Sequence, residues 1–190
     1  MIGKKNIVLG FLYLVLTAGL GPVMILNYYD ARDNAETSKQ TRVGELQQIV
    51  QDNFEADLEP MTAEQIAKMN SKAILALSAR QNAQVPIDAI RKGPHAHGNL
   101  EAILNILAGF LLCFLAINRT FKQLISWTFI LGAAFHSGLL YLSTGLNLSW
   151  AVTLMSTPVA YIGPVLVLAG LVLAGIAAVL GFRGTIEPDY

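Results

Sequence analysis

The segment from Gln123 to Phe182 contains 60 residues and no charged side chain. A second charge-free run extends from Asn6 to Tyr29. Only 14% of all residues are charged, whereas an ordinary soluble domain has about 25%. Soluble domains need charged side chains on their solvated faces, so this pattern excludes a soluble globular enzyme and predicts an integral membrane protein. The 13 basic and 13 acidic residues cancel, which argues against nucleic acid as a partner.

Four apolar segments are long enough to cross a bilayer, which requires about 20 residues in a helix. Pro22 is expected to kink the first of them. We therefore expect an all-α integral membrane protein with four transmembrane helices and a helical extracytoplasmic insertion between helices one and two. The predicted helices cover approximately residues 6–28, 98–118, 123–141 and 159–181, with a short interfacial piece near 149–157.

The charges outside these segments predict the orientation. Basic residues that flank the helices mark the cytoplasmic side, and four crossings place Lys4, Lys5, Arg119, Lys122 and Arg183 on one side. We expect a multi-pass protein of the bacterial inner (plasma) membrane, with both termini cytoplasmic and an uncleaved first helix. The predicted division is 1–29 for transmembrane helix one, 30–97 for the extracytoplasmic segment, 98–182 for helices two to four and 183–190 for a cytoplasmic tail.

The extracytoplasmic segment carries 18 of the 26 charges. It begins with a polar stretch, 30–40, which predicts a linker. Two stripes of apolar residues at three- and four-residue spacing follow and predict an amphipathic helical hairpin. Pro60 is expected to end the first helix, and Thr62 with Gln65 forms a capping box for the second. The stripes are Val43, Leu46, Ile49, Val50, Phe54 and Leu58, and then Ile66, Met69, Ile74 and Leu77.

Candidate site residues cluster where the insertion meets the second helix. The sequence His95-Ala-His97-Gly-Asn-Leu-Glu101 is followed by Asn105. His97, Glu101 and Asn105 are four residues apart, so they share one helix face. Ionisable residues at membrane depth are costly, usually face the protein interior and often carry the function.

The third histidine, His136, lies in the third predicted helix. If helices two and three form an antiparallel hairpin with its turn at 119–122, His136 lies level with Asn105. Glu101 is then about 6 Å nearer the outer surface. Ser137 and Tyr141 could add hydroxyl groups to this cluster.

Several chemistries suit such a cluster. Haem b needs one or two axial histidines and an apolar slot between helices, which His97 and His136 could provide. His95 and His97 together with His136 could instead hold copper or zinc. In a third interpretation, Glu101 and His136 simply pair across a helix interface.

The four predicted helices, with a histidine at the outer end of helix two and the sequence Leu100-Glu101-Ala-Ile-Leu104-Asn105 after it, resemble the styrene oxide isomerase group. These are small four-helix membrane proteins. The resemblance implies haem b between the subunits of an oligomer, with a ferric iron that acts as a Lewis acid on an epoxide oxygen. It implies His97 as the axial ligand, Asn105 as a polar pocket residue and Tyr141 as a pocket aromatic.

The sequence leaves three functions open. The first is a haem b-binding protein, either a small b-type cytochrome with His136 as a second axial ligand or an isomerase-like enzyme. The second is a non-catalytic accessory or assembly subunit of a larger membrane complex, and the third is a copper or zinc protein. Besides the lipid bilayer, we expect a homo-oligomer or a partner complex. A small-residue stripe of Gly170, Ala174 and Ala178 offers a close-packing face, within the chain or between subunits.

Overall fold

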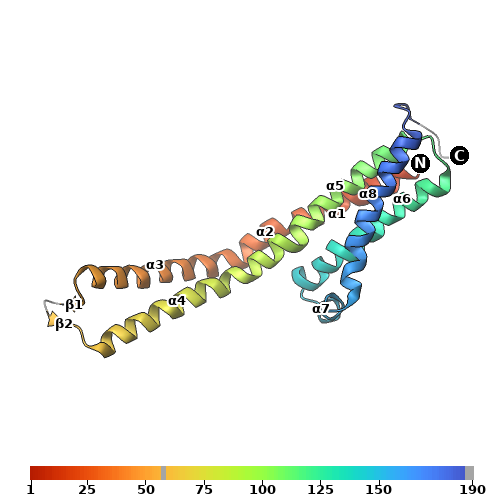
Figure 1. Ribbon diagram of the computed structural model, residues 1–190. Coiled ribbons are helices and arrows are strands. Elements are labelled where there is room, and N and C mark those ends of the chain that lie inside the picture. The colour runs from red at the N-terminus through yellow and green to blue at the C-terminus, as the bar shows by residue number, and fades with distance from the viewer. Residues whose placement is uncertain (57–58, 187–190) are drawn as a thin grey trace. The chain divides into compact units, whose positions relative to one another are not determined.

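A computed structural model describes residues 1–56 and 59–186. In it, four helices are long and apolar enough to cross a membrane, as the sequence predicted. The chain divides into two compact units. We call Met1–Gly21 with Ala89–Tyr190 the four-helix unit, and Pro22–Asp88 the hairpin unit (Figure 1).

The first helical path is longer than one membrane crossing. It begins with α1 (Gly3–Ala18) and continues through α2 (Leu20–Met24), a π-helical turn (Ile25–Tyr29) and α3 (Asp30–Gln51). The α-helix is interrupted at Gly19, close to Pro22, whose nitrogen cannot donate to the preceding turn. The linker predicted over 30–40 is wrong, because this stretch is helical. Pairs one turn apart, such as Lys39 with Glu36, support a helix there.

The hairpin unit joins α3 to α4 (Ala63–Ile90) through a short turn with strands β1 (Glu55–Ala56) and β2 (Glu59–Pro60). Figure 1 shows α3 and α4 side by side. The capping box is confirmed, since Thr62 N donates to Gln65 Oε1 at 2.7 Å and Gln65 N donates to Thr62 Oγ1 at 3.2 Å. The first helix ends at Gln51 and not at Pro60, because Asn53 and Phe54 adopt positive φ angles, which no α-helix can continue.

The buried face of α4 agrees with the predicted stripe at Ile66 and Met69, which are half-buried, and differs from it further along the helix. Ala73 and Ala76 are buried, whereas Ile74 and Leu77 are exposed. Ala73, Ala76 and Arg80 share one helix face, and Arg80 Nε donates to Glu36 Oε2 of α3 at 2.9 Å. Small residues therefore face α3, and the larger apolar side chains point outward.

The second path continues from α4 through a π-helical turn (Arg91–His95) into α5 (Ala96–Cys113). At Gly93 the backbone leaves helical geometry, with φ −86° and ψ −108°. Pro94 follows directly and is buried. A residue that precedes proline avoids the helical region, so the Gly93–Pro94 pair explains the kink at which α5 begins.

The third and fourth spans lie near their predicted places. The loop between spans two and three is 114–118, and not 119–122 as predicted, because Asn118 caps α6 by accepting from Phe121 N at 2.7 Å. The remaining elements are α6 (Arg119–Ala133), π-helical turns (Ala134–Gly138 and Tyr141–Gly145), α7 (Ser149–Met155), a 3-10 turn (Pro158–Tyr161) and α8 (Ile162–Gly181).

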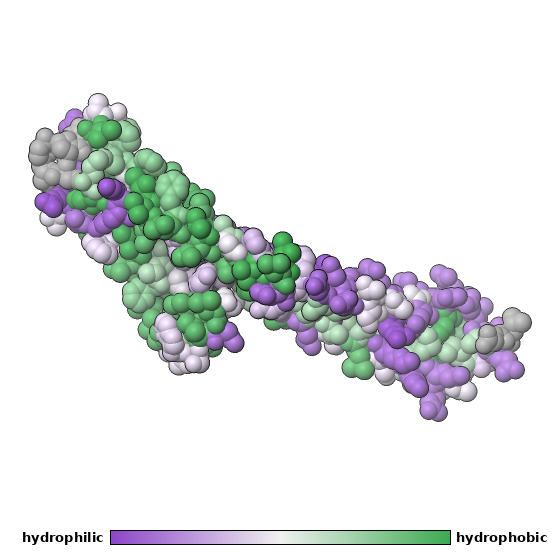
Figure 2. Space-filling model, turned by 180° about the vertical axis from the view of Figure 1, so that it is seen from behind, coloured by the Kyte–Doolittle hydropathy of each residue, from purple (hydrophilic) through white to green (hydrophobic). Residues whose placement is uncertain are grey.

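Small residues let the helices of the four-helix unit approach closely. A methyl group on Gly3 of α1 would come within 2.1 Å of Gly109 O of α5. Gly170 of α8 lies against the ring of Phe129 in α6, and Ala174 belongs to the buried core. The predicted small-residue stripe thus packs within the chain at Gly170 and Ala174. The visible surface of this unit is mainly hydrophobic (Figure 2), as suits lipid contact.

Candidate functional site

The centre of the site is Glu101, a carboxylate on α5 that is only 3% exposed. Its Oε1 is hydrogen-bonded to Nδ1 of His136, and its Oε2 accepts from the hydroxyl of Ser137. The backbone N–H of Ser137 also points at Oε2, at 3.4 Å. One buried acid is therefore fully occupied by two consecutive residues of the third span.

Two consecutive helical residues normally point about 100° apart. His136 and Ser137 lie in the π-helical turn Ala134–Gly138, where the backbone winds more widely and both side chains reach one carboxylate. Such π-helical turns occur frequently at functional sites. From α8, Gly163 lies against the same turn, and a methyl group there would come within 2.3 Å of His136 N.

Tyr13 extends the network into the first span. Its hydroxyl oxygen lies 2.7 Å from Ser137 Oγ. Because the single hydroxyl hydrogen of Ser137 goes to Glu101, Tyr13 is the donor in this bond. Three helical paths thus converge on the carboxylate of Glu101.

His97 lies beside this network. Its ring centroid is 4.7 Å from that of His136, with 53° between the ring planes. Unlike Glu101, His97 is exposed in the single chain. Among the described residues, neither ring nitrogen of His97 has a hydrogen-bond partner, and Nε2 of His136 has none either. The site therefore offers imidazole nitrogens that are free to bind a ligand.

Asn105 belongs to a second polar cluster, deeper in the unit. It is buried, and its Nδ2 donates to Glu101 O at 3.0 Å and to Phe129 O at 3.3 Å. Asn6 Nδ2 donates to Asn105 Oδ1 at 3.1 Å, and Asn6 Oδ1 accepts from Ser126 Oγ. These bonds hold Asn105 among helices, away from the face on which His97 is exposed.

The predicted register of His136 was wrong by about one helical turn. Phe129, and not His136, lies level with Asn105, while His136 lies level with Glu101. The reason is the early turn between the spans, since α6 begins at Arg119 and not at Gln123. The correction brings His136 closer to Glu101 than the sequence predicted.

The other two predicted residues lie at the margin of the cluster. His95 Nδ1 is 2.9 Å from Thr17 O, so its ring is turned toward the first span. Tyr141 is half-buried, and its carbonyl accepts from Leu146 N at 3.0 Å. Among the described residues, neither side chain forms a hydrogen bond or ring contact with the His97–His136 pair.

The arrangement allows a test of the predicted cofactors. Two axial ligands of a haem iron lie on opposite faces of the porphyrin, but the rings of His97 and His136 are in direct contact. One chain therefore does not fit haem ligation by both. Ligation by His97 alone fits, because its nitrogens are free and its ring is exposed. Within the described residues, no three His, Cys, Asp or Glu side chains form a group able to hold a metal ion.

Sequence reasoning missed Asn6, Tyr13, Thr17 and Ser126. The first three have a detectable signal, because Asn6, Gly10, Tyr13 and Thr17 recur every three or four residues along the first span. In a helix surrounded by lipid, the polar and small face is the one that packs inward. Ser126 lies on a similar face of the third span, since Ser126, Ala133 and Ser137 recur at helical spacing and are all buried.

Comparisons with protein-family models, with curated proteins and with solved structures found no match. The resemblance to the styrene oxide isomerase group therefore stays a prediction from the sequence.

Proposed function

We propose that the protein is an integral membrane haem b-binding protein in which His97 is the single axial ligand from each chain. The observation that carries this proposal is the contrast between two neighbouring imidazoles. His97 is exposed in the single chain, whereas the side chain of His136 is only 19% exposed and is held by Glu101 through Nδ1. Within the described part of the chain both rings keep a free Nε2, so exposure is what distinguishes them.

The surface around His97 supports the same proposal. Leu100 and Leu107 lie on the face of α5 next to His97, about 60–80° around the helix axis from it, and are exposed in the single chain. An apolar face below a free imidazole suits a porphyrin, which needs apolar walls. A second copy of the chain would supply the opposite wall, in agreement with the predicted homo-oligomer.

Haem held by His97 alone would supply Lewis-acid or ligand-binding chemistry in preference to electron transfer. The protein's own groups have separate tasks. Glu101 and Ser137 fix the third span against α5, and Glu101 orients the ring of His136. His136 in turn supports the ring of His97 by contact. The geometry therefore favours an isomerase-like protein over a small b-type cytochrome.

The test is an absorption spectrum of the detergent-purified protein, recorded oxidised and then reduced with dithionite. We expect a Soret band that shifts on reduction, and we expect His97→Ala to remove it. His95→Ala is the matched control, because it removes an imidazole two residues away that is turned toward Thr17. Folded protein from haem-replete cells without a Soret band, or a spectrum unchanged by His97→Ala, would overturn the proposal.

The hairpin unit favours a second candidate function, an accessory or assembly subunit of a larger membrane complex. On α4, Ile74 is 61% exposed and Leu75 is 68% exposed, although the unit is rich in charge. Contiguous exposed apolar side chains are typical of protein interaction sites. This function predicts that the protein co-purifies stoichiometrically with larger subunits and that the double variant Ile74→Ser/Leu75→Ser does not. A stable homo-oligomer without other subunits would count against it.

A further inference from the structure

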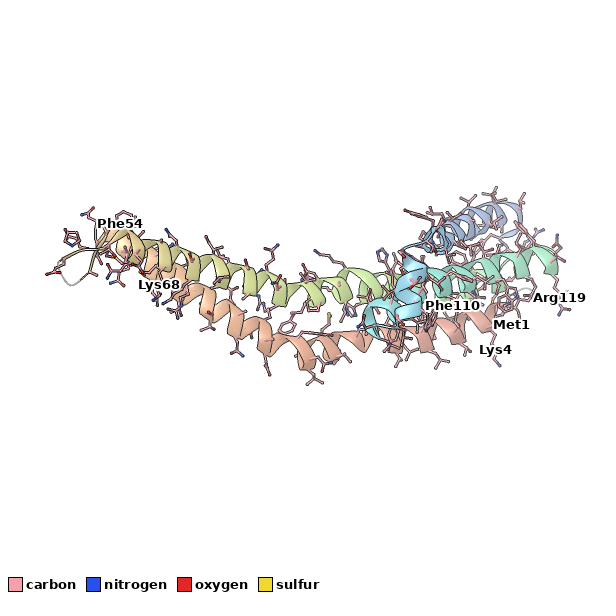
Figure 3. All side chains as sticks on the ribbon, turned by 90° about the horizontal axis from the view of Figure 1, so that it is seen from below. Met1, Lys4, Phe54, Lys68, Phe110 and Arg119 are labelled. Carbon is pink, nitrogen blue, oxygen red and sulfur yellow. The ribbon has the colours of Figure 1, made fainter. Side chains whose placement is uncertain are left out.

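A cavity of about 360 Å³ lies at the end of the four-helix unit where α1 and α6 begin. Lys5, Arg119 and Gln123 line it, together with Met1 and Ile2. Figure 3 shows Met1, Lys4 and Arg119 at this same end. The cavity is remote from His97, because the third span runs from Arg119 at this end through His136 toward Gly145.

The charge of the cavity is positive. Lys5 and Arg119 contribute two cationic side chains, and the exposed Lys4 adds a third close by. Among the described residues, no acidic side chain lines the cavity, while Glu187 and Asp189 fall outside those residues. A cavity of this kind suits an anion.

The position of Lys5 is fixed by two contacts. Its Nζ donates to Gln123 Oε1 at 2.6 Å and lies 4.1 Å from the centre of the Trp127 ring. An ammonium group has three hydrogens, so two remain for an anionic ligand. Arg119 adds a guanidinium group, whose fork matches the geometry of a phosphate.

The surroundings indicate that the phosphate belongs to a lipid. Trp127 and its neighbour Leu124 are each about half exposed, at 50% and 52%, as expected at the level of the lipid headgroups and the upper acyl chains. Basic pockets between transmembrane helices on the cytoplasmic side bind anionic headgroups, and the flanking basic residues predict that this end is cytoplasmic.

We propose that the cavity lined by Lys5, Arg119 and Gln123 binds the phosphate headgroup of an anionic phospholipid. This proposal is independent of haem binding, because it uses other residues at another end of the unit.

Trp127 provides a direct readout, since it contacts Lys5. The chain has two tryptophans, and Trp150 lies beyond the opposite end of the third span, so Trp150→Phe leaves Trp127 as the only reporter. We would reconstitute this variant with lipids that carry brominated acyl chains, which quench tryptophan on contact. The comparison is between brominated phosphatidylglycerol and brominated phosphatidylcholine at equal mole fractions in an excess of unlabelled phosphatidylcholine.

Each basic side chain near an anionic headgroup contributes about fivefold to affinity. We therefore expect Trp127 to prefer phosphatidylglycerol by at least fivefold, and Lys5→Gln/Arg119→Gln to reduce the preference to about onefold. Lys39→Gln, in the hairpin unit, is the matched control and should leave it unchanged. Equal quenching by both lipids, or a preference that survives the double substitution, would overturn the proposal. Displacement of the brominated lipid by inorganic phosphate alone would also overturn it, in favour of a free-anion site.

Discussion

The two units of this protein differ in which residues they bury and which they expose. In the four-helix unit, polar side chains such as Glu101, Asn6 and Asn105 are buried beside an apolar core that includes Leu112 and Phe129, and many other large apolar residues face outward. In the hairpin unit charged residues lie on the surface, small alanines are buried and Ile74 and Leu75 are exposed. The comparison teaches that burial follows the solvent of each unit. Lipid accepts apolar side chains at no cost, so hydrogen bonds and close approach hold the helices together.

The largest expected effect comes from removing the buried carboxylate. Glu101→Ala leaves His136 and Ser137 without their shared partner inside the four-helix unit, and breaking a buried pair of this kind costs about 3 kcal/mol. The free energy of unfolding of the purified protein in detergent, measured by titration with a denaturing detergent, should fall by this amount.

The matched control for that substitution is Glu45→Ala in the hairpin unit. Glu45 pairs with Arg42 on the surface at 2.9 Å, and an exposed pair contributes about 0–1 kcal/mol. Equal losses in the two variants would contradict the contrast between the units.

The next largest effect on stability is expected from replacing a closely packed glycine by alanine, and two other glycines serve for comparison. A methyl group on Gly109 would lie 2.7 Å from Gly3 O, whereas Gly175 and Gly44 have nothing within 4 Å. Gly109→Ala should cost about 2 kcal/mol through overpacking. Gly44→Ala, in the middle of α3, should stabilise the hairpin unit by about 0.5–1 kcal/mol because alanine favours a helix.

Thermal unfolding followed by circular dichroism checks these signs, with Gly175→Ala as the neutral reference. A loss at Gly44→Ala as large as that at Gly109→Ala would show that the two units are packed alike, contrary to this account.

A smaller effect distinguishes the two faces of α4. Ala73 is 2% exposed, so Ala73→Leu should overpack the face toward α3 and cost about 1–2 kcal/mol. Leu75→Ala removes a side chain that is already in solvent and should change stability by no more than about 0.5 kcal/mol. Amide hydrogen exchange of α3 and α4 measures the stability loss in each variant. A larger loss in Leu75→Ala than in Ala73→Leu would contradict the assignment of the buried face to Ala73.

The smallest effect is the pH dependence of the hairpin unit. Hydrogen bonds from Lys39 and Arg80 lower the pKa of Glu36 from 4.5 to about 2. A depressed pKa contributes stability that is present above pH 4.5 and is lost as the pH falls toward 2. Exchange protection around Glu36 and Arg80 should therefore weaken across this range in the wild type. In Glu36→Gln the same decrease should be absent, and an identical decrease in both proteins would contradict the role of Glu36.

Much of this architecture could be predicted from the sequence, because charge-free runs in a lipid-spanning protein have few alternatives. The four spans, the Thr62–Gln65 capping box and the proximity of Glu101 to His136 follow from patterning of that kind. The register between the second and third spans could not be predicted. The loop from Phe114 to Asn118 is largely apolar, so its composition does not distinguish it from the end of a helix.

The buried face of the hairpin unit and the polar network of the first span were missed for one reason. Hydrophobic periodicity gives most weight to large side chains, yet several close helix contacts in this protein involve small or polar residues. Ala73 and Gly10 add little to a hydrophobic stripe, and Tyr13 and Asn6 interrupt it. Which of two adjacent imidazoles is held by Glu101, His97 or His136, depends on a π-helical turn that the sequence does not reveal.

The central claim is that the exposed His97, and not the more buried His136 that Glu101 holds, binds the haem iron. Electron paramagnetic resonance of the ferric protein tests it most directly, because one axial histidine leaves the iron high-spin and two make it low-spin. We predict a high-spin signal for the wild type. The His136→Ala variant should keep this high-spin signal, and the His97→Ala variant should lose it. A low-spin signal in the wild type that becomes high-spin in His136→Ala would contradict the claim, and so would a folded protein from haem-replete cells with no haem signal.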